Sequence, residues 1–369
     1  MPASLFDPVA VGPLTLPNRV VMSPMTRCRA LADHTPTDLM VEYYRQRAGA
    51  GLIVAEGTIV DPSGDGWAHV GGLYEDRHVD AWRRVTDAVH RQGGRIVNQL
   101  WHCGRVCHES QVPGGRVLSS VSHQPPEDVV AHIGDGGEEI PASRADALTT
   151  DDMDRLAEAY AAATARAKDA GFDGVELHAA NGYLIDQFLR DGVNRRDDDF
   201  GGSAANRVRF PVRVVEAIAN AWAADRVGVR VSPVGMYNAM SDSDPADTFL
   251  TFARELNRIG VVYLDVVEPA NPFDPQDSGL NRPDVCNALQ DAFDGLYMAN
   301  GGYDAESAAA VLEAGKADLV SFGRPYIANP DLAIRLKLNA ELTGGDHSKN
   351  YGGGAEGYID YPTLAMQGR

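Results

Sequence analysis

The stretch DGVELHA (173–179), with the turn ANGY (180–183) directly after it, has the pattern of a buried strand ending in polar residues. Seven further apolar runs of similar length occur along the chain: RVVMSP (19–24), GLIVAEGTIV (51–60), RIVNQLW (95–101), RVGVRVS (226–232), VVYLDVVE (261–268), LYMAN (296–300) and DLVSFG (318–323). Helical patterns alternate with these runs at 36–49, 79–92, 151–170, 204–223, 246–258, 283–293, 304–314 and 329–340. Eight strand–helix pairs in succession predict a parallel sheet closed into a (β/α)₈ TIM barrel.

A doubly wound open sheet is the alternative arrangement of such pairs. It usually has a G-x-G-x-x-G turn after the first strand, and the turn after 19–24 has no such pattern. We therefore expect one barrel domain over residues 1–369. Two long connections, 102–149 and 268–283, follow strands and belong to the C-terminal face, where barrel active sites are built. We expect the segment 343–369 to fold over that same face.

Composition narrows the class of protein. The 369 residues carry 33 basic and 52 acidic side chains, a formal net charge of −19 that disfavours binding to nucleic acid or to an anionic membrane surface. No run of eighteen apolar residues occurs, and the first residues, MPASLFDPVAVGPL, lack the features of a secretory signal. Four cysteines are too few for a disulfide scaffold at this length, so a cytoplasmic protein with reduced thiols is expected.

The run 175–183 carries the most informative chemistry. Alternation along a strand directs Glu176 and His178 into the barrel if their apolar neighbours face the helices. His178 then lies at the rim, with Asn181 and Tyr183 on the turn just beyond. Two N–H donors beside a phenolic proton suit the reduction or enolisation of a carbonyl compound, although the same residues could form only a structural hydrogen-bond cluster.

A second set of polar residues lies at other strand ends. Gln99 is near the end of the third strand, Arg230 near the end of the fifth, and Thr26 follows the first. Arg230 alternates with valines and so points inward, where its charge needs a partner. That partner is either Glu176, in a buried salt bridge, or an anionic group bound at the rim.

Glycines follow the last two strands. Gly301 and Gly302 come after the seventh, and Gly323 precedes Arg324 after the eighth. Loops at these places form the recurrent phosphate site of TIM barrels, and an arginine there can add a charge-assisted fork. The sequence predicts a phosphate group at this point.

Longer motifs connect these residues to a known family. They are NRVVMSPMTR (18–27), EYYRQRAGAGLIVAEGT (42–58), QLWHCGR (99–105), GFDGVELHAANGYLIDQFL (171–189), GVRVSP (228–233), FGRPYIANPDL (322–332) and YGGGAEGYIDYP (351–362). From about Phe6 to Leu364 the chain resembles the old yellow enzymes, which are FMN-dependent ene-reductases. It resembles those of the bacterial group that includes pentaerythritol tetranitrate reductase, morphinone reductase and N-ethylmaleimide reductase.

The resemblance implies roles for individual residues. Non-covalent FMN would be bound by Pro24, Met25, Thr26, Gly57, Gln99, Arg230, Gly301, Gly302, Gly323 and Arg324. Trp67, Trp101 and Tyr351 would shape the substrate cavity. His178 and Asn181 would bind the substrate oxygen, and Tyr183 would donate the proton. Asn181 stands where some relatives have a second histidine, and still supplies an N–H.

The resemblance also implies a reaction. NADPH or NADH would pass hydride to flavin N5 and leave, and an enone, enal, maleimide, nitroalkene or nitrate ester would then be reduced in the same site. The protein would act as a monomer or a homodimer. Two alternatives stay open: a metal-dependent barrel hydrolase or lyase using His178 and Glu176, and a flavin-binding barrel without turnover.

The stretch WHCGRVCH (101–108) needs a separate interpretation. Its spacing of Cys103 and Cys107, with His102 and His108 beside them, matches no established zinc pattern, so no metal is expected. By resemblance, His102 belongs to the family's Trp-His-x-Gly-Arg motif. The two cysteines are then either packing residues or an exposed oxidisable thiol.

Overall fold

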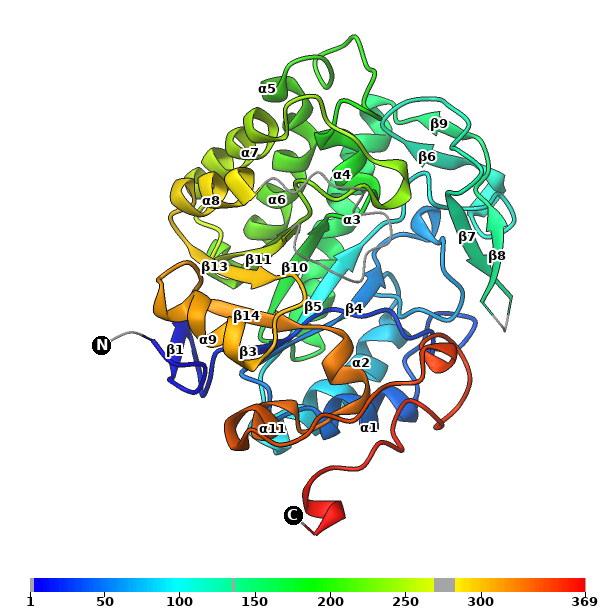
Figure 1. The fold of residues 1–369 in the computed structure, drawn as a ribbon. Coiled ribbons are helices and arrows are strands. Elements are labelled where there is room, and N and C mark those ends of the chain that lie inside the picture. The colour runs from blue at the N-terminus through cyan, green and yellow to red at the C-terminus, as the bar shows by residue number, and fades with distance from the viewer. Residues whose placement is uncertain (1–2, 135–136, 269–282, 369) are drawn as a thin grey trace.

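A closed barrel of parallel strands forms the centre of the molecule (Figure 1). The computed structural model describes residues 3–134, 137–268 and 283–368. The eight barrel strands are β3 (Val20–Met22), β4 (Leu52–Ile59), β5 (Ile96–Trp101), β10 (Gly174–Ala179), β11 (Val227–Val231), β12 (Tyr263–Val267), β13 (Leu296–Asn300) and β14 (Leu319–Phe322). They pair in chain order, and β14 pairs with β3. The predicted TIM barrel is confirmed, and the open sheet is not formed.

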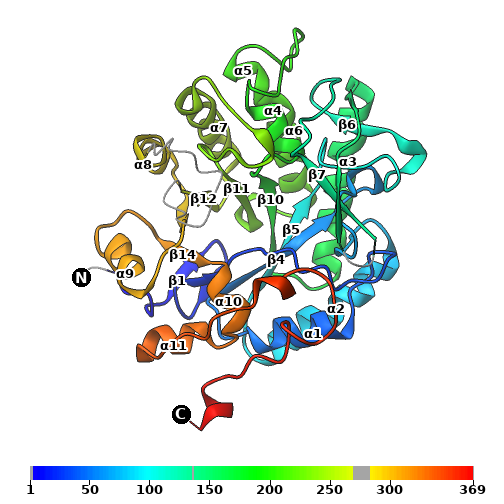
Figure 2. The same ribbon diagram turned by 45° about the vertical axis from the view of Figure 1, so that its right-hand side comes forward.

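Helices surround the strands (Figure 2). Those of the barrel units are α1 (Asp38–Gln46), α2 (Asp76–Arg91), α3 (Thr150–Asp169), α6 (Arg209–Ala221), α7 (Pro245–Ile259), α8 (Pro283–Ala292), α9 (Ala305–Glu313) and α11 (Leu332–Leu338). Their apolar faces bury against the strands, which supplies most of the stability of such helices. Thr149 caps α3, because its side chain accepts a hydrogen bond from the Asp152 N–H.

Three short helices depart from the sequence prediction. They are α4 (Leu184–Leu189), α5 (Ala204–Arg207) and α10 (Arg324–Ala328). The expected helix 204–223 is divided at Val208, and the expected helix 329–340 begins only at Leu332. Pro330 therefore does not start α11, and α10 occupies the turn directly after β14. No helix among the described residues is long and apolar enough to cross a membrane.

An N-terminal hairpin, absent from the prediction, covers the end of the barrel opposite the long loops. It consists of β1 (Val9–Val11) and β2 (Leu14–Leu16), and its buried side chains pack with apolar residues of the barrel interior. Gly12 turns the hairpin at φ +54°, and a Cβ there would lie 2.1 Å from the carbonyl oxygen of Asp225, just before β11. The interior is thus closed with apolar groups at this end.

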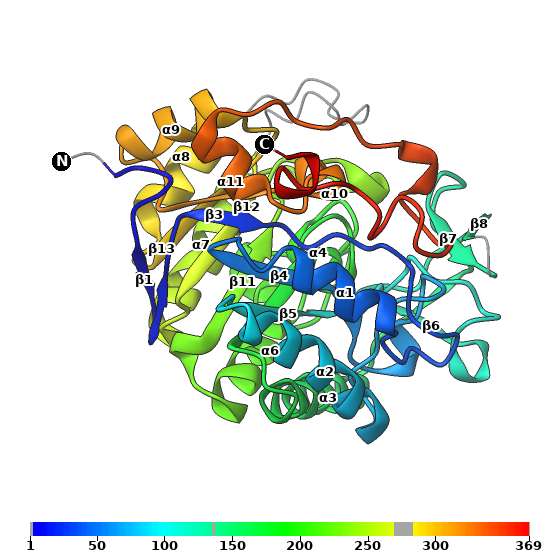
Figure 3. The same ribbon diagram turned by 90° about the horizontal axis from the view of Figure 1, so that it is seen from below.

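The long loop after β5 forms two small sheets beside the opposite face. Strand β6 (Val117–Ser119) pairs with β9 (Ala145–Ala147), and β7 (Val130–Ile133) pairs with β8 (Glu138–Pro141). The C-terminal segment runs from α11 towards the β7–β8 hairpin (Figures 1 and 3). Most of the expected excursion 268–283 lies outside the described residues.

Candidate active site

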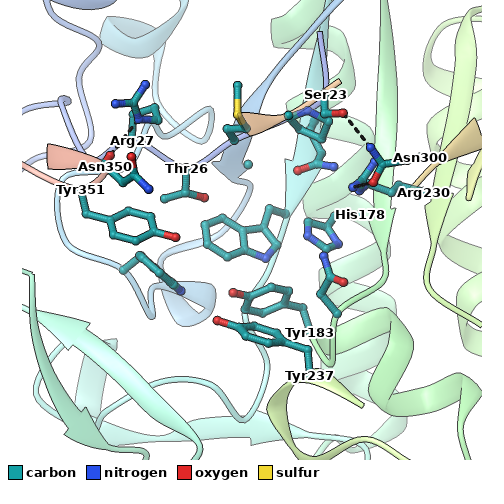
Figure 4. Close-up of a pocket in the computed structure, with 18 of the residues that line it drawn as sticks. Ser23, Thr26, Arg27, His178, Tyr183, Arg230, Tyr237, Asn300, Asn350 and Tyr351 are labelled. Carbon is teal, nitrogen blue, oxygen red and sulfur yellow. Dashed lines mark hydrogen bonds between the residues drawn. The ribbon is translucent and has the colours of Figure 1, made fainter. Parts of the chain in front are cut away.

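A cavity of about 340 Å³ opens at the C-terminal ends of the barrel strands (Figure 4). A second cavity, of about 170 Å³, adjoins it along Asn300, Gly323 and Arg324, which line both. Of the predicted site residues, the first cavity is lined by Pro24, Met25, Thr26, Gly57, Trp67, Gln99, Trp101, His178, Asn181, Tyr183, Arg230, Gly323, Arg324 and Tyr351. Gly301 and Gly302 line the second. The fold therefore gathers the whole predicted set around one elongated space.

His178 is a neutral N–H donor on the wall of this cavity. It is the penultimate residue of β10 and is buried, and burial together with the nearby Arg230 charge lowers the pKa of its imidazole to about 3. The Ala180 N–H donates to its Nδ1 at 3.3 Å, so in the neutral ring the proton resides on Nε2. An imidazole in this state can donate a hydrogen bond to a ligand oxygen over the whole physiological pH range.

Tyr183 lies beside His178, with ring centroids 5.0 Å apart and planes at 79°. Burial raises the pKa of its phenol well above the usual value, so the hydroxyl keeps its proton. Figure 4 shows both side chains on the same wall of the cavity. The pair offers one hydrogen-bond donor and one proton to the same ligand.

The turn between these residues is fixed by hydrogen bonds to both backbone polar groups of Gly182. Asn181 and Gly182 have φ of +55° and +75°, a conformation that asparagine and glycine tolerate best. The Gly182 N–H donates to the Asp186 carboxylate at 2.9 Å, and the Gly182 carbonyl accepts from the Gln187 side chain at 2.7 Å. The Asn181 N–H donates to Ser232 Oγ at 2.7 Å. Helix α4, which the sequence prediction missed, is what brings Asp186 and Gln187 to the turn.

Arg230 pairs with Asp265 and not with Glu176, which corrects the buried salt bridge considered from the sequence. The reason is strand register: Arg230 on β11 lies opposite Asp265 on β12, whereas Glu176 on β10 lies opposite Gly228. Arg230 also donates to Asn300 Oδ1 at 3.0 Å. The guanidinium is thereby held at the rim of the cavity.

Glu176 makes two hydrogen bonds to neutral groups. It accepts from Gln99 Nε2 at 2.8 Å and from the Tyr263 hydroxyl at 3.0 Å. Because the Gln99 amide donates to Glu176 with its nitrogen, its carbonyl oxygen stays available as an acceptor for a ligand N–H. Gln99 and Arg230 thus present an acceptor and a cationic donor to the same end of the cavity.

An aromatic wall closes the outer side. Trp101 packs edge-on against Tyr183 with centroids 4.8 Å apart, and Trp67 stacks on His132 of the β7–β8 hairpin at 3.4 Å. Tyr351 is 5.2 Å from the Trp67 ring and half exposed. Arg27 and Arg29 fix the segment before Tyr351 by donating to the Asn350 carbonyl. The C-terminal segment therefore contributes an ordered side chain to the cavity.

The cysteine-rich stretch belongs to the packing of the loop. Cys103 and Cys107 are completely buried, and burial raises the pKa of the Cys103 thiol well above its usual value. This contradicts the interpretation of an exposed oxidisable thiol. His102 Nδ1 accepts from the Gly104 N–H at 3.0 Å and orders the turn. Among the described residues, no three His, Cys, Asp or Glu side chains gather where they could hold a metal ion.

The sequence prediction missed several residues of the cavity. They are Ser23, Arg27, Tyr237, Asn300, Ile327 and Asn350. Asn300 and Tyr237 could have been found, since the first ends a barrel strand and the second is an aromatic residue shortly after β11. No sequence pattern marks Asn350 as a cavity residue, because its position depends on the path of the C-terminal segment.

The two joined cavities fit a flat heterocycle with a phosphate tail. Thr26, Gln99 and Arg230 supply hydrogen-bonding groups for the polar edge of a ring, and the second cavity offers glycine backbone N–H groups next to Arg324. Trp101 and His178 lie nearly parallel, at 16°, across the remaining side. These groups have the chemistry required to hold FMN.

Comparisons with known proteins agree with this geometry. Residues 4–343 match the model of the NADH:flavin oxidoreductase / NADH oxidase family. The chain is 38% identical to rice 12-oxophytodienoate reductase 7 over 377 residues, covering 99% of this chain and 95% of that protein. The structure of morphinone reductase in complex with tetrahydroNAD superposes with a TM-score of 0.91, at 41% identity and 98% coverage of both chains. An old yellow enzyme homologue from Zymomonas mobilis superposes with a TM-score of 0.92, at 40% identity, covering 98% of this chain and 99% of that one.

Proposed function

Because the chain belongs to the NADH:flavin oxidoreductase / NADH oxidase family, the family of the old yellow enzymes that its motifs resemble, we propose that it reduces the activated C=C bond of α,β-unsaturated carbonyl or nitro compounds. It is an oxidoreductase that uses FMN, with NADPH or NADH as the reductant. When bound, FMN would supply the hydride-transfer chemistry between the nicotinamide and the β-carbon of the second substrate.

One observation carries the proposal: a neutral imidazole, a carboxamide and a protonated phenol line the same cavity. His178 Nε2–H and the Asn181 amide bind the carbonyl or nitro oxygen of the substrate and withdraw electron density from its double bond. The β-carbon is then electron-poor, and the negative charge that develops on the oxygen is stabilised by the two donors.

Tyr183 provides the proton that completes the reaction. Its hydroxyl is protonated at all physiological pH values and lies close to His178, so it donates to the α-carbon of the substrate held by the two donors. Trp101 and Trp67 exclude water from the reacting carbons, since both rings are buried on the cavity wall.

Thr26, Gln99 and Arg230 bind the polar edge of the FMN ring, and Gly301, Gly302, Gly323 and Arg324 bind its phosphate. Support comes from the donor and acceptor set in the two cavities. Pro24, Met25 and Gly57 line the same cavity and would contact the ring, and Tyr351 lines it as well.

Isotope labelling tests the proposed reaction. The protein, reduced anaerobically with C4-deuterated NADH or NADPH, is mixed with 2-cyclohexenone, and the product is examined by NMR. We expect deuterium at the β-carbon, and in deuterated water a second label at the α-carbon. The His178→Ala variant should lose this turnover, whereas His90→Ala, on the outer helix α2, should retain it. Absence of label from the β-carbon would refute the proposed hydride transfer.

A further inference from the structure

Two carboxyl groups and one guanidinium share a buried site beneath the cavity. Glu176 and Asp265 have no exposed surface, and Arg230 is 7% exposed. Arg230 pairs with Asp265, whereas among the described residues Glu176 receives hydrogen bonds only from the neutral groups of Gln99 and Tyr263. One cation thus faces two acids, and it neutralises one of them.

The second acid is therefore held close to its protonated form. The pKa of Glu176 is raised to about 8, mainly by burial and then by the charge of Asp265. Arg230 and the two hydrogen bonds act in the opposite direction and lower it. Among the described residues, the groups that act on Glu176 are Gln99 from β5, Arg230 from β11, and Tyr263 and Asp265 from β12. His178, two residues further along the strand of Glu176, is also close to Arg230. His178 is neutral, so the charge balance of the site is set by the two acids and Arg230.

This site is directly coupled to the end of the cavity that would bind the flavin ring. Gln99 donates to Glu176 and lines the cavity, and Arg230 pairs with Asp265 and lines it as well. A negative charge on a ring bound against Gln99 and Arg230 would act on Glu176, which accepts a hydrogen bond from Gln99. A second negative charge close to a buried carboxyl group favours the neutral form of that group.

We propose that Glu176 is a redox-linked proton site: in the pH range in which it is ionised beside the oxidised flavin, it gains a proton when the flavin is reduced and loses it when the flavin is reoxidised. The inference rests on the proposed function. Hydride brings two electrons and one proton to the flavin and leaves the ring with a negative charge, and a solvent proton forms an O–H bond on Glu176. When hydride leaves for the substrate, that O–H bond breaks and the proton returns to solvent. By linkage, a protonated Glu176 favours the reduced flavin to the same extent.

The midpoint potential of the bound FMN, measured from pH 6 to pH 10, tests this directly. Uptake of one proton per two electrons gives a slope of about −30 mV per pH unit, and uptake of two gives about −59 mV, since a tenfold change in a two-electron equilibrium constant equals about 30 mV. We expect the shallow slope near pH 6, where Glu176 is already protonated, and the steeper slope above the pKa of Glu176, about 8. A single shallow slope over the whole range would overturn the inference.

Two variants separate this role from a structural one. Glu176→Gln should show the shallow slope throughout, whereas Glu255→Gln, on the outer helix α7, should keep the break. Tyr263→Phe removes a hydrogen bond that favours the charged carboxylate, so it should move the break to higher pH. A break that persists in Glu176→Gln, or that does not move in Tyr263→Phe, would overturn the assignment.

Failure of this inference can be distinguished from failure of the proposed function. A chain that binds no FMN would overturn both. A chain that binds FMN and reduces enones, with a slope that never steepens, would overturn only the proton site.

Discussion

Substituting Gly57 by alanine should displace the aromatic wall of the cavity. A Cβ at this position would lie 2.6 Å from Trp101 Cε3 and 2.9 Å from its Cδ2. Carbon atoms in contact are normally about 3.5–4.0 Å apart, so the indole must move by about 1 Å. Trp101 is 1% exposed, and the rings of Tyr183 and His178 lie next to it. The displacement is therefore transmitted to the two proposed substrate-binding and proton-donating groups.

The expected effects concern both stability and rate. Overpacking of this kind costs about 1–3 kcal/mol in the free energy of unfolding. A misplacement of about 1 Å in an active site can cost roughly 100-fold in rate, so we expect a loss of that order when an enone reoxidises the reduced enzyme. Chemical denaturation measures the first effect and anaerobic stopped-flow absorbance the second.

Controls for Gly57→Ala follow from the same geometry. Gly49→Ala should leave the rates unchanged, because a Cβ at Gly49 has no atom within 4 Å. Adding Trp101→Phe to Gly57→Ala should recover part of the lost stability, since the smaller ring leaves room for the methyl group. A Gly57→Ala protein with wild-type stability and wild-type reoxidation rate would refute the reasoning.

Three further predictions concern single groups. Tyr183→Phe should slow reoxidation of the reduced enzyme by an enone by about 10²–10⁴-fold and spare its reduction by NADPH or NADH, both measured by stopped flow; equal losses in both steps would exclude Tyr183 as the proton donor. Arg324→Ala should weaken FMN binding by about 10–100-fold in a fluorescence titration, the loss expected for a hydrogen bond to a charged group, and an unchanged Kd would remove Arg324 from the phosphate site. Burial raises the pKa of Glu56 from 4.5 to about 7, so the folded protein loses stability as pH rises through that range. The Tm of Glu56→Gln should accordingly rise relative to the Tm of the wild type between pH 5 and pH 8. A Tm difference that stays constant over this range would contradict the prediction.

Much of the barrel could be predicted because its signals are local. Each strand is a short apolar run, and most predicted site residues lie on a barrel strand or on the turn after it, which places them at one face whatever the details of packing. Trp67 and Tyr351, on longer connections, were predicted from the family resemblance alone. Asn181 and Tyr183 lie near His178 because the turn that carries them follows directly after the strand of His178. The location of such residues can be predicted once the fold class is predicted correctly.

Other features depend on contacts between distant segments and could not be read from the sequence. Arg230 had two acids within reach, and only the strand register selects Asp265 over Glu176. Burial of Cys103 and Cys107 results from the way the loop after β5 folds back on itself. The N-terminal hairpin was missed because its strands have three residues each, too few for a clear alternation.

The central claim is that FMN lies in the cavity with its ring facing His178 and Asn181, and a phenol titration tests it most directly. p-Hydroxybenzaldehyde, added to the purified yellow protein, should bind as a phenolate between the two donors and produce a long-wavelength charge-transfer absorbance. His178→Ala should abolish this absorbance while FMN remains bound. A colourless protein, or an absorbance that survives in His178→Ala, would contradict the account.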